Sequence, residues 1–185
     1  MTNGFFAAIG VTLRAFGSRA GSEAANPAAV TWVHASIALA IMLATQFSTQ
    51  LGPIAMVAPE LLSAMAVPFA ISIAVQLVPF VVIVACAIWM KQPERLPMVV
   101  MLTALGLIII QLTALTLSLA NVRSDAALVG VMAYMTGRAA RTMLGSSIAG
   151  AIVAGLVVAV GVVAASLLFY ALPGAEPAIG AAGAG

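Results

Sequence analysis

The sequence predicts an all-α integral membrane protein, a bundle of about five transmembrane helices with an interfacial amphipathic helix at the N-terminal end. The first reason is composition, because 64% of the 185 residues are hydrophobic and only 6% are charged. A soluble domain carries about 25% charged residues, which keep its surface in water. The second reason is that apolar runs long enough to cross a bilayer recur between short polar segments. The outer surface is therefore expected to face lipid.

Residues 1–26 are predicted to form the interfacial helix and a linker. Large apolar side chains fall on one face of a helix over 4–19, at Phe5, Ile9, Leu13 and Phe16, and Phe6 lies beside them. Glycines interrupt this face, so it is too narrow to span a membrane. A helix of this kind lies along the membrane surface with its rings at the acyl boundary.

Residues 27–172 are predicted to form the transmembrane bundle. Asn26-Pro27 is a helix-start signal, because Asn can cap a helix and proline is tolerated in its first turn. Pro68 and Pro79 fall inside the second span, which is about 43 Å long and is expected to bend or tilt. The spans are expected at about 28–50, 61–90, 97–120, 122–141 and 146–172, followed by a flexible Gly/Ala-rich tail over 173–185.

Charge decides the fourth span and the topology. A helix over 122–141 is about 30 Å long, which is enough to span. It can cross the bilayer because the long side chains of the arginines at its ends can extend to the headgroups. If it crosses, six of the seven Lys and Arg fall on the N-terminal side, which matches the enrichment of basic residues on the cytoplasmic side. We therefore predict five spans in a bacterial inner membrane, with the N-terminus cytoplasmic and the C-terminus outside. The cytoplasmic membrane interface is expected to contain Phe5, Phe6, Trp32, Trp89, Arg138 and Arg141.

Two amides and one histidine are the polar positions of interest. Gln76 and Gln111 lie inside the second and third spans, where lipid offers them no partner. They are expected to bond each other or a facing Ser or Thr and so join helices. The alternative is an uncharged transport pathway lined by both glutamines and the two span prolines. His34 is interpreted as an interfacial side chain bonded to a neighbouring carbonyl or water, with a haem or pigment ligand as the alternative.

Small residues recur every four positions on the last predicted helix. One row consists of Ser147, Ala151, Gly155 and Ala159, and a second beside it consists of Ser146, Gly150 and Ala154. Small side chains let helix backbones approach closely in lipid. The rows are predicted to pack on another helix, either in this chain or in a partner.

The sequence offers no basis for catalysis, metal binding or nucleic-acid binding. It contains no glycine-rich phosphate loop, nucleophile elbow, zinc-ligand spacing or carboxylate pair. The charged residues sit only at the ends of the predicted spans and none lies in mid-span, where a proton relay would need one. The basic residues are interpreted as topology signals. We expect no enzyme activity, no metal, no cofactor and no nucleic-acid partner.

Two segments, together with the helix layout, carry a family resemblance. The first is Gly4-Phe5-Phe6 through Phe16 ahead of Asn26-Pro27, and the second is the basic, glycine-containing turn over 136–147. On these features the chain resembles a bacterial member of the Yip (Ypt-interacting protein) family of polytopic membrane proteins. The resemblance implies a cytoplasmic N-terminal segment, about five helices and no catalytic residues.

The expected function is contact within the bilayer. A scaffold, assembly factor or accessory subunit would be held by helix packing against other membrane subunits or a second copy. The first alternative is a small transporter or channel near Gln76 and Gln111. The second is a pigment- or haem-associated subunit that uses His34.

Overall fold

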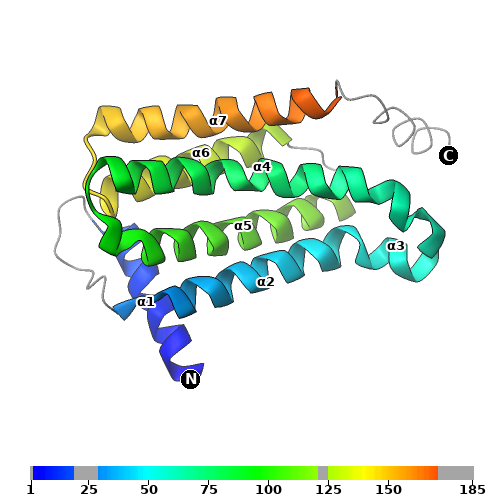
Figure 1. The fold of residues 1–185 in the computed structure, drawn as a ribbon, viewed down its shortest axis with the longest axis horizontal. Coiled ribbons are helices and arrows are strands. Elements are labelled where there is room, and N and C mark those ends of the chain that lie inside the picture. The colour runs from blue at the N-terminus through cyan, green and yellow to red at the C-terminus, as the bar shows by residue number, and fades with distance from the viewer. Residues whose placement is uncertain (1, 19–28, 121–124, 171–185) are drawn as a thin grey trace.

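Five long helices lie side by side in the computed structural model, which describes residues 2–18, 29–120 and 125–170 (Figure 1). They are α2 (Trp32–Gln50), α4 (Leu62–Trp89), α5 (Leu96–Leu119), α6 (Asp125–Thr142) and α7 (Ile148–Tyr170). Helix α1 (Thr2–Gly17) lies across one end, and α3 (Gly52–Val57), η2 (Pro59–Leu61) and η3 (Pro93–Arg95) form the connections. No strand occurs in these ranges, so the all-α class is confirmed for them. The predicted linker over 20–26 and the tail over 173–185 lie outside them.

Four helices, rather than the predicted five, are long and apolar enough to cross a membrane. The qualifying segments are Trp32–Gln50, Met65–Trp89, Pro93–Leu119 and Ile148–Leu167. Helix α6 has 18 residues, which is about 27 Å, and its last two turns carry Arg138 and Arg141. Its composition is therefore too polar for it to count with the others. It nevertheless runs along the length of α7 in the bundle (Figure 1).

The first span begins later than the sequence suggested. Helix α2 starts at Trp32, and Thr31, with the extended backbone of an N-cap, precedes it. Ala29 and Val30 are not in an α-helix, while the predicted start signal at 26–27 lies outside the described residues. In the second span, α4 continues through both Pro68 and Pro79.

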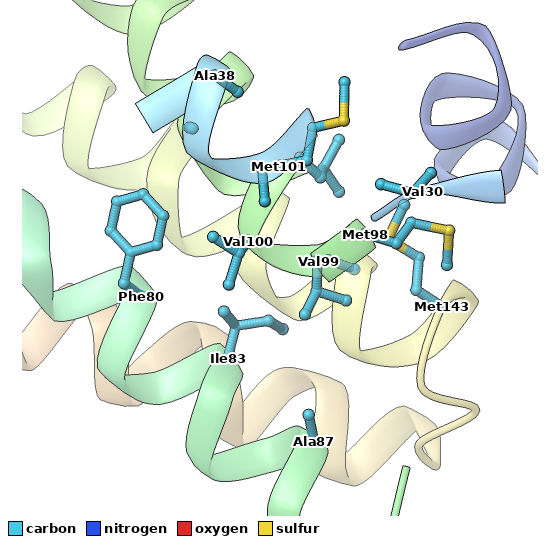
Figure 2. Close-up of a cluster of buried hydrophobic side chains, with 14 of the residues drawn as sticks. Val30, Ala38, Phe80, Ile83, Ala87, Met98, Val99, Val100, Met101 and Met143 are labelled. Atoms are coloured by element: carbon cyan, nitrogen blue, oxygen red, sulfur yellow. The ribbon is translucent and has the colours of Figure 1, made fainter. Parts of the chain in front are cut away.

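Helix α5 occupies the centre of the bundle. Eleven of its residues are buried, and they form the middle of a core to which α2, α4 and α6 contribute (Figure 2). Met98, Val99 and Met101 are almost completely enclosed, as is Ile83 of α4. The outward faces of α2, α4 and α7 carry exposed Val, Ile, Leu and Phe side chains along their length. Apolar exposure on this scale is typical of a surface that faces lipid.

Helices α6 and α7 form an antiparallel pair whose backbones nearly touch. A β-carbon added at Gly137 would lie 2.6 Å from the carbonyl oxygen of Ala151, and one at Gly155 would lie 2.9 Å from that of Ala133. Each helix thus presents a small residue to the other at two points four residues apart. The partner of the row containing Ala151 and Gly155 is α6 of the same chain, which answers the question that the sequence left open.

The end of the bundle covered by α1 collects the basic residues. Arg14 lies on α1, Lys91 and Arg95 lie in the turn between α4 and α5, and Arg138 and Arg141 end α6 (Figure 1). Arg95 donates through Nη1 to the carbonyl of Met143, which ties two turns together. The opposite end carries the carboxylate Glu60 in η2. We call the first of these the basic end.

Two glycines of α6 test the close contact with α7. Gly137→Ala should lower the free energy of unfolding by about 1–3 kcal/mol, because its methyl group would push the two backbones apart. Gly130→Ala is the control, since no atom lies within 4 Å of its added carbon and alanine favours a helix by about 1 kcal/mol. Thermal unfolding of the purified protein in detergent measures both. Equal stabilisation by the two substitutions would contradict the close contact.

Candidate functional site

A chain of hydrogen-bonded amides crosses the interior from α5 to α2. Gln111 of α5 donates through Nε2 to Oε1 of Gln76 on α4, at 2.8 Å. Gln76 donates in turn to Oε1 of Gln46 on α2, at 2.5 Å. The three side chains are 9%, 8% and 1% exposed, respectively. We call this chain the glutamine ladder, and it contains the bond between Gln76 and Gln111 that the sequence suggested.

The ladder ends on a hydroxyl shared by two amides. Gln46 donates through Nε2 to Oγ of Ser72 at 2.6 Å, and Gln50 donates to the same oxygen at 2.8 Å. At the other end, Oε1 of Gln111 is buried and has no hydrogen-bond partner among the described residues. Because a buried polar group left without a partner costs about 1–3 kcal/mol, each bond along the chain opposes separation of the three helices.

Sequence reasoning found two members of the ladder and missed three. Gln46, Gln50 and Ser72 were not selected, although a signal was present. Gln46 and Gln50 are four residues apart on α2, and Ser72 and Gln76 are four residues apart on α4. Polar residues at this spacing share a helix face. Two such pairs on neighbouring antiparallel spans predict that their faces meet.

The amides of the ladder do not line the cavity between α4, α5 and α6. A cavity of about 20 Å³ lies between α4, α5 and α6, beside Pro79, and its walls include neither Gln76 nor Gln111. Two hydroxyls line this cavity, those of Thr103 and Thr136, and each donates to a carbonyl of its own helix. The ladder itself contains amides and a hydroxyl. Such groups form hydrogen bonds but do not ionise near neutral pH.

His34 completes the N-terminal cap of α2. Its Nδ1 accepts a hydrogen bond from the Thr31 backbone N–H at 3.1 Å, so the partner is an amide rather than the expected carbonyl or water. An accepting Nδ1 places the proton of a neutral ring on Nε2. A β-carbon added at Gly4 would lie 3.6 Å from that Nε2. The start of α1 therefore lies where the plane of an axially bound haem or chlorin would have to fit.

Arg138 fastens α1 to the bundle. Its Nε donates to the Phe16 carbonyl at 3.1 Å, and its guanidinium lies 5.4 Å from the centre of the Phe16 ring. A second bond reaches the Gly17 carbonyl at 3.5 Å. These carbonyls end α1, where the helix dipole favours a cation. Arg138 was expected at the membrane interface, and the structure gives it this specific partner.

The inward face of α1 differs from the predicted apolar stripe. Ala8, Thr12 and Ala15 are buried against the bundle, and the Thr12 hydroxyl lies 3.8 Å from the Met101 sulfur. Small residues occupy this face because α1 packs closely on α5 and α6. Of the stripe, Phe5, Ile9 and Phe16 pack at the edges of the core and Leu13 is half exposed. Phe6 is 70% exposed and stays available to a membrane surface.

The remaining interface residues lie on the outside of the basic end. Trp32 begins α2 and is 56% exposed, while Trp89 ends α4 and is 88% exposed. Of the small residues on α7, Ser147 and Gly150 are exposed at the start of the helix, and the Ser147 hydroxyl accepts the Gly150 N–H at 3.1 Å. Ser147, directly before α7, therefore caps the first turn of the helix through the Gly150 N–H.

A groove runs along the outer side of the α6–α7 pair. It has a volume of about 390 Å³ and a mostly apolar lining. Its floor consists of small residues, among them Gly137, Ala151, Gly155 and Ala159, and its end at the basic end of the bundle carries Arg138 and Arg141. A second, shallower hollow lies further along α7 and is lined by Ala159, Val160, Val163, Ala164 and Leu167. Both features face the surroundings of the bundle rather than its interior.

No protein-family model, curated protein or solved structure matches this chain. No group of three or more His, Cys, Asp or Glu side chains that could hold a metal ion occurs in the described ranges. Among the described residues, the features considered for function are the glutamine ladder, the groove between α6 and α7, and the hollow further along α7.

The ladder is tested by a double-mutant cycle. Gln111→Leu should lower the free energy of unfolding by about 1 kcal/mol, because it leaves one buried group of Gln76 unpaired, and Gln76→Leu should lower it by about 2 kcal/mol, because it leaves groups of both Gln111 and Gln46 unpaired. The double substitution should cost less than the sum, with a coupling of about 0.6 kcal/mol. Unfolding in mixed detergent and SDS micelles measures these values. Thr103→Val, whose hydroxyl donates to a carbonyl of its own helix, is the uncoupled control with Gln111→Leu, and strict additivity of the first pair would contradict the ladder.

Proposed function

We propose that the protein is a non-enzymatic, multi-pass membrane protein that acts by contact, as a scaffold, assembly factor or accessory subunit. The observation that carries this proposal is that the interior amides bond to one another. The amides that could have lined a pathway bond to one another, and the neighbouring cavity of about 20 Å³ does not reach them. A polar transport route would need those groups to face water. Because these amides are paired with one another, the outer faces of the described helices are the better place for a function.

The contact face that we assign is the outer side of α7 around Ala164. The hollow there is lined entirely by Ala, Val and Leu side chains, of which Ala159 and Ala164 are small. Small residues at such a place let a second helix approach closely, so that dispersion contacts form without a hydrophobic driving force. No charged residue lines the hollow, which favours an apolar helix as the partner.

The five-span topology belongs to the same proposal. If α6 crosses, the basic end collects Arg14, Lys91, Arg95, Arg138 and Arg141 on one side of the membrane. That arrangement agrees with a cytoplasmic N-terminus and an external C-terminus. It also agrees with the layout of the Yip family. Neighbours on three sides support α6 as a span, because it packs against α4, α5 and α7.

Labelling of single cysteines tests this topology. In a Cys86→Ala background, Met56→Cys should react with a membrane-impermeant maleimide added to intact cells, because Met56 is 88% exposed in α3 at the outer end. Ser147→Cys and the control Lys91→Cys should react only after the cells are opened. If α6 does not cross, Ser147→Cys will react from outside together with Met56→Cys.

Photo-crosslinking in native membranes tests the contact face. A benzophenone maleimide attached at Ala164→Cys, in the Cys86→Ala background, should give a crosslinked product of one defined mass. Ala44→Cys, at a comparable depth on the exposed side of α2, is the control and should give far less of it. Equal yields at both positions, or recovery of the protein only as a monomer, would refute the contact role. The crosslinked product should still form when Gln76→Leu is added, because the proposed contact lies on the outer face of α7 and does not use the glutamine ladder.

A further inference from the structure

The groove between α6 and α7 differs from the Ala164 hollow in having a cationic end. Arg138 and Arg141, three residues apart in the last turns of α6, both line it. Arg138 is already held by the α1 carbonyls and by the Phe16 ring. Arg141 is half-buried at the rim, and its guanidinium makes no hydrogen bond to the protein within the described residues. A guanidinium presents up to five donors, so Arg141 can bind an anion in a bidentate manner.

The rest of the groove is shaped for a hydrocarbon chain. From the Arg141 rim it follows α7 past Ala151 and Gly155 to Ala159, and Ile152 and Leu156 form part of its wall. Tyr134, one turn from Arg138 along α6, also lines it and is 63% exposed. Aromatic side chains of this kind commonly lie at the headgroup level of a bilayer. A cation, an interfacial aromatic and an apolar channel thus follow one another in the order of a phospholipid's parts.

We propose that this groove binds an anionic phospholipid, with its phosphate at Arg141 and one acyl chain along Ala151, Gly155 and Ala159. Charge favours an anionic lipid over a zwitterionic one. Five Lys and Arg lie at this end in the described residues, against the single carboxylate Glu94. Basic pockets between membrane helices bind anionic headgroups through this kind of charge excess.

The same observations disfavour the other occupants. In a two-fold symmetric dimer formed through this groove, the Arg141 side chains of the two copies would approach each other, which costs energy in a low dielectric. An apolar helix from another protein would cover Arg141 without offering it a partner. The inference does not rest on the contact role, which is assigned to the hollow around Ala164, although the groove and the hollow meet at Ala159.

Fluorescence quenching of the purified full-length protein tests the proposal. Trp32→Phe and Trp89→Phe remove both native tryptophans, and Tyr134→Trp places one reporter in the groove. The protein is reconstituted into mixed vesicles of phosphatidylcholine and phosphatidylglycerol, in which one or the other lipid carries brominated acyl chains. Brominated phosphatidylglycerol should quench the reporter about fivefold more effectively per molecule, as expected for one basic residue at a membrane surface.

Substitutions at Arg141 separate a specific site from general attraction. Arg141→Gln should bring the ratio of quenching by brominated phosphatidylglycerol to quenching by brominated phosphatidylcholine close to one. Arg141→Lys should retain most of this preference. Lys91→Gln, at the same end but outside the groove, should leave it unchanged. A preference that survives Arg141→Gln, or that falls equally with Lys91→Gln, would overturn the site. Quenching by neither lipid would show that a protein segment covers the groove, and would overturn it as well.

Discussion

The close approach of α6 and α7 fixes the position of almost everything at the basic end. Because Gly137 and Gly155 have no side chains, the two backbones come into contact, and α6 lies along α7 instead of projecting away from it. This contact carries Arg138 and Arg141 to the same end as Arg95. Arg138 can then reach the last carbonyls of α1, and Arg95 can reach Met143. The outer groove is the other side of the same contact.

A second constraint is the lack of polar partners in a hydrocarbon environment. Packing apolar side chains together stabilises helix association little when lipid tails are equally apolar. An amide inside the bundle gains more, because separation would leave it unpaired. The glutamine ladder uses this difference: it links α5, α4 and α2 with directional bonds that set their relative register. Elsewhere in the interior, hydroxyls such as Thr103 and Thr136 return to their own helices.

The sequence predicted the helices better than their contacts. Composition and run length located the spans to within a few residues, since bilayer thickness allows few other solutions. The start of α2 was wrong because a proline signal was preferred to Thr31, which serves as the N-cap. The inward face of α1 was misjudged for a different reason. Hydrophobicity alone favoured the large residues, whereas close packing on α5 selected Ala8, Thr12 and Ala15.

The sequence predicted the candidate site only for the two polar residues that each lacked a hydrogen-bond partner within their own span. Gln76 and Gln111 stood out because each would be isolated in its own span. Gln46 lies nearer the end of α2, where water could have satisfied it, so nothing in α2 alone marked it as buried. The small-residue row on α7 was visible, but its partner was not, since Ala133 and Gly137 are unremarkable in a helix that carries arginines. Which residues of α6 contact the small residues of α7 can be read only from the folded chain.

The ladder also marks a change in how the bundle is held together. On its basic side, α2, α4, α5 and α6 all contribute buried side chains to one continuous core. Beyond it, the last turns of α5 and the first turns of α4 contain no buried residue among those described. Gln46, Gln76 and Gln111 are thus the last buried residues of α2, α4 and α5 toward the outer end, although the Gln50–Ser72 bond still joins α2 to α4 beyond them. Directional bonds at this level hold the three helices in register where fewer of their side chains are buried. The ladder lets a bundle with a tightly packed half and a loosely packed half keep a single register.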